Sequence, residues 1–236
     1  MIDLKSHKKI IVFTGAGMSA ESGLKTFRDS NGLWEEYRIE DVATPEAWQK
    51  NKPQVLKFYN ARLKQVIEAK PNKGHLILAE LQKHFDVQII TQNIDDLHER
   101  AGSEKVLHLH GIITKMRSSV DDELIYPIKN KEIKLGDLCE KGSQLRPHIV
   151  WFGEMVPEMD NAVKLISQAD ILIVVGTSLV VYPAAGLINY APKNAAKFLV
   201  DPGNFDASVL HGIEQIKKTA SEGLKDMEEK LLKLLH

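Results

Sequence analysis

The stretch KKIIVFTGAGMSAESG, residues 8–23, decides the fold class of this 236-residue chain. A β-branched apolar run ends at Gly15 and Gly17, and a helical pattern follows. Two glycines allow a tight turn and let a phosphate approach the backbone N–H groups at the positive end of a helix. Ala20 occupies the third position of the glycine fingerprint, where alanine is tolerated. We therefore expect a dinucleotide loop between a strand and a helix; a glycine-rich turn without a ligand is the alternative.

Short apolar runs alternate with helical patterns along most of the chain. Strand–helix alternation of this kind predicts an α/β fold with a doubly wound parallel sheet. Residues 112–147 break the rhythm because they are polar and weakly patterned, and we expect them to form a small inserted subdomain. The expected strands are residues 8–15, 87–92, 105–111, 148–153, 171–177 and 197–201, and the expected helices are residues 53–69, 73–84, 157–168 and 221–235.

The composition limits the classes of partner. The net charge is −1 and no block of like charges occurs, which argues against a nucleic acid or a membrane surface held by bulk electrostatics. No apolar run reaches the length of a membrane span, and no signal peptide is evident. Cys139 is the single cysteine, so an intrachain disulfide framework is excluded. We expect a cytoplasmic protein.

Polar side chains follow four of the expected strands. In open α/β sheets, ligands gather beyond the carboxyl ends of the strands. Each of these residues alone would suit a cap or a turn, but four clusters at four strand ends predict a site for a polar ligand. The clusters contain Gln92, Asn93 and Asp95, then His110, then Gly176, Thr177 and Ser178, and finally Asp201.

Two histidines alternate on one strand in HLHG, residues 108–111. His110 lies beside Gly111 at the rim of the expected sheet, and we expect it to act as a general base. We expect His108 to be a packed, hydrogen-bonded histidine. A metal pair formed by the two is the alternative, but the sequence offers no further ligands nearby.

An arginine lies on the apolar face of the helix expected over residues 53–69. At about 100° per residue, Val55, Tyr59, Arg62 and Val66 share one stripe. A charge buried there is costly unless it is paired. The helical pattern alone favours an arginine that reaches solvent or pairs with a protein acid such as Asp41.

Taken together, six motifs of the chain resemble those of the sirtuins, the NAD-dependent protein lysine deacylases. The motifs are TGAGMSAESG, TFRD with GLW, TQNID, HLHG, LRPHIVWFGE and VVGTS. The matching pieces occur in the family's order over roughly residues 10–190. The resemblance implies one catalytic domain with a Rossmann-like large part, a smaller part, and an acyl-lysine peptide in the cleft between them. The large part would comprise about 1–30, 75–112 and 146–236, and the small part about 31–74 and 113–145.

The resemblance also implies NAD as cofactor and a role for each matching residue. In the family the acyl oxygen attacks the ribose carbon as nicotinamide leaves. His110 would then act as base through the ribose hydroxyls, and Asn93 would be the second catalytic residue. The residues expected around NAD are Gly15, Ala16, Gly17, Ser19, Phe27, Arg28, Gln92, Asn93, Asp95, Gly176, Thr177, Ser178, Asp201 and Ala220.

Tyr59 and Arg62 resemble the Tyr-x-x-Arg pair of the class III branch, which accepts succinyl and malonyl groups. Spaced three apart on a helix, the two side chains can converge on one carboxylate. Ala43 would leave room for a longer acyl chain. Val150 would line the lysine tunnel with Phe152 beside it, and the VWFGE segment would pair with the substrate peptide as an added strand.

One departure from the family concerns zinc. Sirtuins usually carry four zinc cysteines in the small part, and the corresponding positions here are Ser118, Asp121, Gly136 and Cys139. One thiolate cannot build a tetrahedral structural site. We therefore expect no structural zinc, and a small part held by its apolar residues.

Two rival functions use the same pocket. A sirtuin-like ADP-ribosyltransferase or NAD hydrolase would release ADP-ribose or label a protein instead of forming acyl-ADP-ribose. A non-catalytic NAD sensor would bind NAD without releasing nicotinamide. The intact His110 and Asn93 favour deacylation of protein or peptide substrates.

Overall fold

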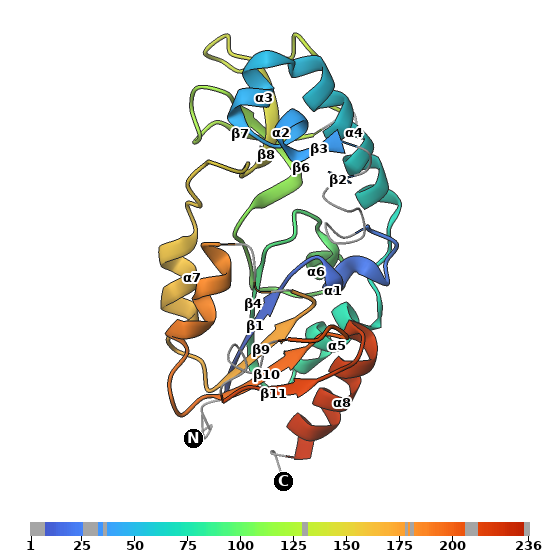
Figure 1. Ribbon diagram of the computed structural model, residues 1–236, viewed down its shortest axis with the longest axis vertical. Coiled ribbons are helices and arrows are strands. Elements are labelled where there is room, and N and C mark those ends of the chain that lie inside the picture. Colours follow the sequence, from blue (N-terminus) through green and yellow to red (C-terminus); the bar gives the residue numbers. More distant parts are fainter. Residues whose placement is uncertain are drawn as a thin grey trace, which may run out of the picture.

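The computed structural model describes residues 8–25, 33–34, 37–128, 132–177, 179, 182–205 and 212–233. These residues form an elongated molecule with two lobes (Figure 1). One lobe contains a six-stranded parallel sheet, and the other contains a three-stranded antiparallel sheet. The parallel sheet and the smaller antiparallel one together confirm the predicted α/β fold with an inserted subdomain.

The parallel sheet has its first strand near its middle. The chain pairs β4 and β5 on one side of β1, then returns to place β9, β10 and β11 on the other side. This reversal of direction leaves a crevice at the carboxyl ends of the strands, where ligands of such sheets bind. The strands are β1 (Lys9–Thr14), β4 (Asp86–Thr91), β5 (Val106–His108), β9 (Ile171–Val175), β10 (Ala196–Val200) and β11 (Glu214–Ile216).

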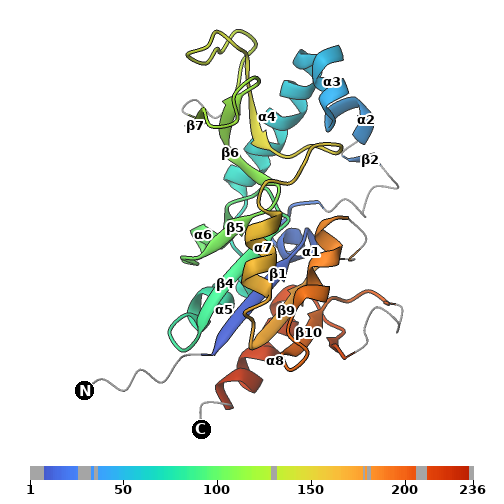
Figure 2. The ribbon, with the colours of Figure 1, turned by 90° about the vertical axis from the view of Figure 1, so that its left-hand side faces the viewer.

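Helices cover both faces of this sheet, which explains the unbroken apolar runs of the central strands. Successive residues of a strand point to opposite faces. Ile10 and Val12 pack in the core beneath α5 and α8, whereas Ile11 and Phe13 pack in the core beneath α7 and η2. Figure 2 shows α7 in front of the sheet. These helices are α5 (Lys73–Leu81), α7 (Met159–Ile166), η2 (Ala184–Tyr190) and α8 (Ala220–Leu232).

The smaller lobe packs helices against the antiparallel sheet, whose order is β7-β6-β8. Its longest helix, α4, begins after Asn51, whose side chain accepts the N–H of Gln54 as an N-cap. No described helix combines the length and the apolar character that a membrane crossing requires. The elements of this lobe are β2 (Leu33–Trp34), β3 (Tyr37–Arg38), α2 (Ile39–Val42), α3 (Pro45–Lys50), α4 (Lys52–Glu68), β6 (Gly111–Ser118), β7 (Ile125–Pro127) and β8 (Leu145–Ile149).

Three details differ from the sequence-based expectation. The strand expected over 148–153 is β8, which ends at Ile149 and belongs to the antiparallel sheet. Residues 112–147 contain the strands β6 and β7, which are only partly buried and therefore lack a clear apolar pattern. The short strand β11 pairs at the edge of the parallel sheet and was not expected. The residue boundaries expected for the two parts of the chain stay a prediction.

Candidate active site

A cavity of about 880 Å³ lies over the carboxyl ends of the central strands and extends to the smaller lobe. This volume is at the upper end of the range for small-molecule sites, roughly 300–1,000 Å³. Phe27, Arg28 and Ser178 lie outside the described residues. All the other residues assigned to the site from the sequence line the cavity: Gly15, Ala16, Gly17, Ser19, Ala43, Tyr59, Arg62, Gln92, Asn93, Asp95, His110, Val150, Phe152, Gly176, Thr177, Asp201 and Ala220.

The glycine loop enters the short helix α1 (Gly17–Ala20) pressed against the end of β9. The N–H of Gly15 donates to the Val175 carbonyl (3.0 Å), and the N–H of Gly17 donates to the Gly176 carbonyl (2.8 Å). A Cβ atom on Gly15 would lie 2.7 Å from the Thr177 Cβ, and one on Gly17 would lie 2.7 Å from the Gly176 Cα. The two glycines are therefore required by contact with a neighbouring strand end, a reason that the sequence pattern alone does not reveal.

A buried hydrogen-bond network connects this loop with the end of β4. The Asn93 side-chain amide donates to the Gly15 carbonyl (3.0 Å) and to the Ser19 hydroxyl (3.2 Å). The Ser19 hydroxyl in turn donates to Asp95 (2.9 Å), and the Leu97 N–H donates to the other carboxylate oxygen of Asp95 (3.1 Å). The network therefore fixes the orientation of each polar group before a ligand arrives.

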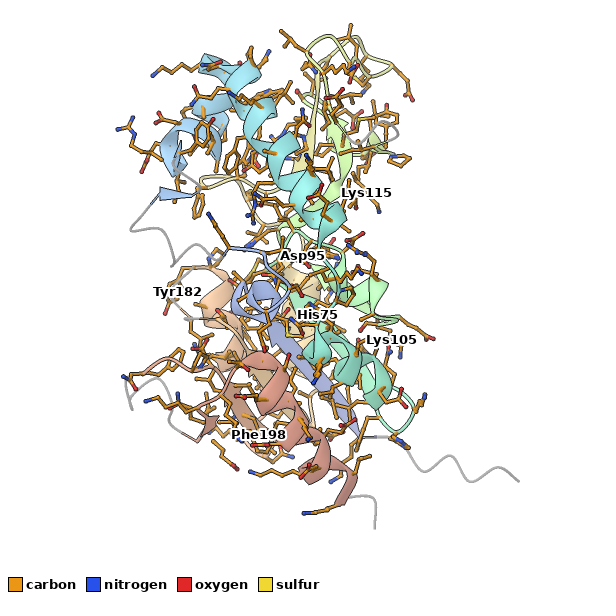
Figure 3. The ribbon with its side chains drawn as sticks, turned by 90° about the vertical axis from the view of Figure 1, so that its right-hand side faces the viewer. His75, Asp95, Lys105, Lys115, Tyr182 and Phe198 are labelled. Atoms are coloured by element: carbon orange, nitrogen blue, oxygen red, sulfur yellow. The ribbon has the colours of Figure 1, made fainter. Side chains whose placement is uncertain are left out.

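Asp95 lies at the junction of the two lobes (Figure 3). Its side chain is almost fully enclosed, and burial raises its pKa above the ordinary aspartate value. The Leu97 N–H and the Ser19 hydroxyl oppose that rise because they stabilise the ionised carboxylate.

His110 is arranged as a neutral base. Its Nδ1 lies 3.0 Å from the Gln92 carbonyl, which can only accept, so Nδ1 carries the proton and Nε2 is left as the acceptor. Burial lowers the pKa of His110, although the Gln92 carbonyl opposes this change. A neutral imidazole with a free acceptor nitrogen suits general-base catalysis.

His108 has both nitrogens engaged. Its Nε2 lies 2.6 Å from the Glu99 carboxylate and its Nδ1 lies 3.2 Å from the Asn93 carbonyl. These contacts agree with a packed, hydrogen-bonded histidine and leave no ring nitrogen for a metal shared with His110. Within the described ranges, no three His, Cys, Asp or Glu side chains gather as metal ligands would.

Tyr59 and Arg62 face the cavity from α4 in the smaller lobe. Both side chains are buried, at 2% and 6% exposure. Burial raises the pKa of Tyr59, so its hydroxyl is protonated and can donate a hydrogen bond. Arg62 donates to the Gln65 side chain (3.1 Å), while Asp41 is bound by Arg38 through both carboxylate oxygens.

The wall next to Tyr59 contains an ion pair that sequence reasoning missed. Arg146 binds Glu154 through two hydrogen bonds of 2.6 and 3.0 Å, and its guanidinium lies 3.2 Å from the centre of the Trp151 ring. Glu154 also accepts the backbone N–H of Trp151 (2.7 Å), and Arg117 approaches it at 3.5 Å. The motif LRPHIVWFGE contains both partners, and their opposite charges eight residues apart were the available signal.

The segment after β8 bridges the two lobes. The Val150 N–H donates to the His110 carbonyl (2.9 Å), and the Phe152 N–H donates to the Ala43 carbonyl (3.0 Å). These two donors are therefore engaged within the chain. A peptide that pairs with this segment as an added strand would have to use its other backbone groups.

Asp201 and Ala220, expected from the sequence around NAD, line another part of the cavity. Asp201 is buried and accepts the Gly203 N–H (2.8 Å), which closes the turn after β10. Ala220 begins α8, and Glu21 joins this end to the glycine loop by accepting the Ser221 N–H (2.9 Å). Glu21 lines the cavity and was not expected from the sequence.

A glycine loop at the strand-order reversal of a parallel sheet, with a large cavity above it, defines a dinucleotide-binding α/β protein of the Rossmann type. Residues 15–183 match the family model described as "Sir2 family". The chain belongs to the Sir2 family.

Relatives and solved structures are similar over nearly the whole chain. An NAD-dependent protein deacylase of Bacteroides thetaiotaomicron is 52% identical over 230 residues, which cover 95% of this chain and 98% of that protein. The crystal structure of a Sir2 homologue–NAD complex superposes with a TM-score of 0.85 at 38% identity and covers 98% of this chain and 92% of that chain. A Sir2 protein with a deacetylated p53 peptide and 3′-O-acetyl ADP-ribose has a TM-score of 0.81 at 31% identity, with 96% and 95% covered.

Proposed function

We propose that this chain is an NAD-dependent protein lysine deacylase that removes succinyl and malonyl groups in addition to acetyl groups. The observation that carries the acidic-acyl part is the placement of Tyr59 and Arg62, buried, in the cavity that also contains the glycine loop and His110. Deacylation itself follows from membership of the Sir2 family and from the curated relatives.

The cofactor is NAD, and the cavity offers groups suited to it. Gly15, Ala16 and Gly17 bring backbone to the cavity at the start of α1, as a pyrophosphate requires. Asn93 and Asp95 are preorganised for polar groups of a ribose or a carboxamide. When bound, NAD supplies the ADP-ribosyl group that receives the acyl group as nicotinamide leaves.

The residues of the chain would then perform two tasks. His110, neutral and with Nε2 as acceptor, would take a proton from a ribose hydroxyl. Asn93 holds the glycine loop and the Ser19–Asp95 pair in one orientation, so that the reacting groups meet with little loss of entropy.

The acyl end of the cavity has a positive balance of charge. Tyr59 lies in the fields of Arg62, Arg146 and Glu154, and Arg117 adds a further positive charge close to Glu154. Arg117 also pairs with Asp122 (3.2 Å), so three arginines face two carboxylates, and the remaining positive charge favours a carboxylate on the ligand. A charge-assisted contact to that carboxylate is worth about 1.5–3 kcal/mol, or roughly 10- to 150-fold in preference.

The test compares acetyl-lysine and succinyl-lysine peptides of one sequence, with NAD, and identifies the products by mass spectrometry. We expect Arg62→Met to lose about 10- to 150-fold in succinyl removal while acetyl removal survives. Lys64→Met, on the exposed face of the same helix, is the matched control and should change neither rate. Equal loss of both activities in Arg62→Met would assign Arg62 a structural role.

The products also decide the reaction class. Acyl-ADP-ribose identifies deacylation, whereas free ADP-ribose or a labelled protein identifies NAD hydrolysis or ADP-ribosyl transfer. Binding of NAD without release of nicotinamide would identify a sensor.

A further inference from the structure

The imidazole of His108 is placed between two hydrogen-bond acceptors. Nε2 faces a carboxylate oxygen of Glu99 on α6 (Leu97–Arg100), and Nδ1 faces the backbone carbonyl of Asn93. Neither acceptor carries a proton at neutral pH, so the geometry is satisfied fully only by an imidazolium that donates from both nitrogens. The side chain of His108 is 13% exposed and that of Glu99 is 38% exposed, so this charge-assisted bond is shielded from water mainly on the histidine side.

The surrounding charges favour this ion pair. Burial lowers the pKa of His108, but the Glu99 carboxylate and the Asn93 carbonyl outweigh it, and the net pKa is raised. Burial likewise raises the pKa of Glu99, but His108 outweighs it and the net pKa is lowered. Asp95 attracts His108, and Lys115 of β6 attracts Glu99, while burial holds the pKa of His98 well below the ordinary histidine value.

We infer that His108 is a positioning residue whose imidazolium, held by Glu99, fixes the backbone of Asn93 and thereby the network that receives NAD. The inference rests on the proposed function only in taking Asn93 as part of the NAD site. His108 does not line the cavity, so it acts through Asn93.

The Asn93 residue shows how the effect is transmitted. Its N–H donates to the Thr91 hydroxyl (3.0 Å), its carbonyl accepts from His108, and its amide binds Gly15 and Ser19. When His108 loses its proton, one of its nitrogens can no longer donate, and either the Asn93 carbonyl or Glu99 loses its partner. NAD should therefore bind most tightly below the pKa of His108, and affinity should fall as pH rises through it.

The test uses Glu99→Gln in the full chain, because this change removes the charge and keeps the shape. Nitrogen-15 NMR should show both nitrogens of His108 protonated at neutral pH in the wild type, and one in Glu99→Gln. Calorimetry should show that Glu99→Gln binds NAD about 10-fold more weakly than the wild type at neutral pH. In Glu99→Gln, the fall in NAD affinity with rising pH should also occur at a lower pH than in the wild type.

Two further variants control this experiment. Glu99→Asp keeps the negative charge, so its NAD affinity should fall at the same pH as in the wild type. If residue 99 had only a structural role, the pH dependence would not differ between the charged and the uncharged variant. Glu104→Gln, an exposed glutamate outside the site, should leave both readouts unchanged. Thermal unfolding checks that each variant folds.

Three results overturn the inference: a neutral His108 in the wild type, an unchanged affinity profile in Glu99→Gln, or no NAD binding by the wild type. The last result would refute the proposed function as well. Normal NAD binding with a shifted profile, but without deacylation, would refute only the deacylase proposal and support the positioning role.

Discussion

The proton on His110 Nδ1 determines what this residue can do. Because the Gln92 carbonyl accepts a hydrogen bond from Nδ1–H, Nε2 is the acceptor, and burial keeps the ring neutral to lower pH than an ordinary histidine. The base form is present above the His110 pKa. Deacylation should therefore rise as pH rises through that pKa, and the acid limb of kcat/KM should lie below the ordinary histidine range.

Removing this base should impair chemistry and spare binding. We expect His110→Ala to lower kcat by about 10²- to 10⁴-fold, the usual contribution of a general base, while NAD still binds. Rapid-quench assays and calorimetry measure the two quantities separately. His84→Ala changes an exposed histidine and should match the wild type. An equal loss of kcat in His84→Ala would refute the assignment of His110 as the general base.

Glu154 is the carboxylate partner of Arg146, and it also accepts the backbone N–H of Trp151. Burial alone would raise the pKa of Glu154, but Arg146 outweighs it and the pKa is lowered. A lowered folded-state pKa means that this pair stabilises the fold above the ordinary glutamate pKa and ceases to do so as pH falls through the folded value.

We expect Glu154→Gln to reduce the free energy of unfolding by about 2 kcal/mol at neutral pH, since it leaves a buried arginine without its charge partner. The loss should shrink at acidic pH, where Glu154 is protonated in the wild type. Urea unfolding at several pH values measures it. Glu123→Gln, an exposed residue of the smaller lobe, is the control and should cost little at any pH.

At the scale of elements, the loop over residues 132–144 is organised by hydrogen bonds. Gln144 donates to the Lys134 carbonyl (2.9 Å) and accepts the Gly136 N–H (2.7 Å). The Cys139 thiol donates to the Ser118 hydroxyl (3.3 Å), and Lys141 pairs with Asp121 (2.6 Å). We propose that these contacts stabilise the lobe without structural zinc.

Two measurements test the zinc-free lobe. Metal analysis should find no stoichiometric zinc, and a chelator should leave the melting temperature unchanged. Gln144→Ala should speed amide hydrogen exchange over 134–138 about 10-fold or more, because the two side-chain hydrogen bonds to this segment are lost. The exchange of α8 should stay at its wild-type rate. One zinc per chain would refute the proposal.

At the scale of the whole molecule, most strands of the large sheet could be predicted from the sequence. The central strands are covered on both faces, so they read as continuous apolar runs, and the polar residues that follow them meet at one edge. This is why His110, Asn93 and Asp95 could be placed together in advance. The positions of these three residues depend only on which strand each one follows and on the parallel pairing of those strands.

Other features depend on partners that are remote or weakly patterned. Strand β6 is partly exposed and gives no clear alternation, so the antiparallel sheet was not recognised. The requirement for Gly17 comes from Gly176, far along the chain, and cannot be read from the loop itself. The His108–Glu99 pair joins a strand to a helix, and only the folded molecule shows that both nitrogens of His108 are engaged.

The tryptophan that lies beside Tyr59 in the cavity gives the protein an optical reporter. Trp151 lines the cavity and its ring lies 5.7 Å from that of Trp48, so two of the three tryptophans of the chain share one environment. In a Trp34→Phe variant, all tryptophan fluorescence, excited where tyrosine does not absorb, would come from this pair. Titration with succinyl-lysine peptide should then change the emission in a saturable way, and Arg62→Met should weaken that response. Substrate engagement could thus be followed in real time, without a label and before any turnover.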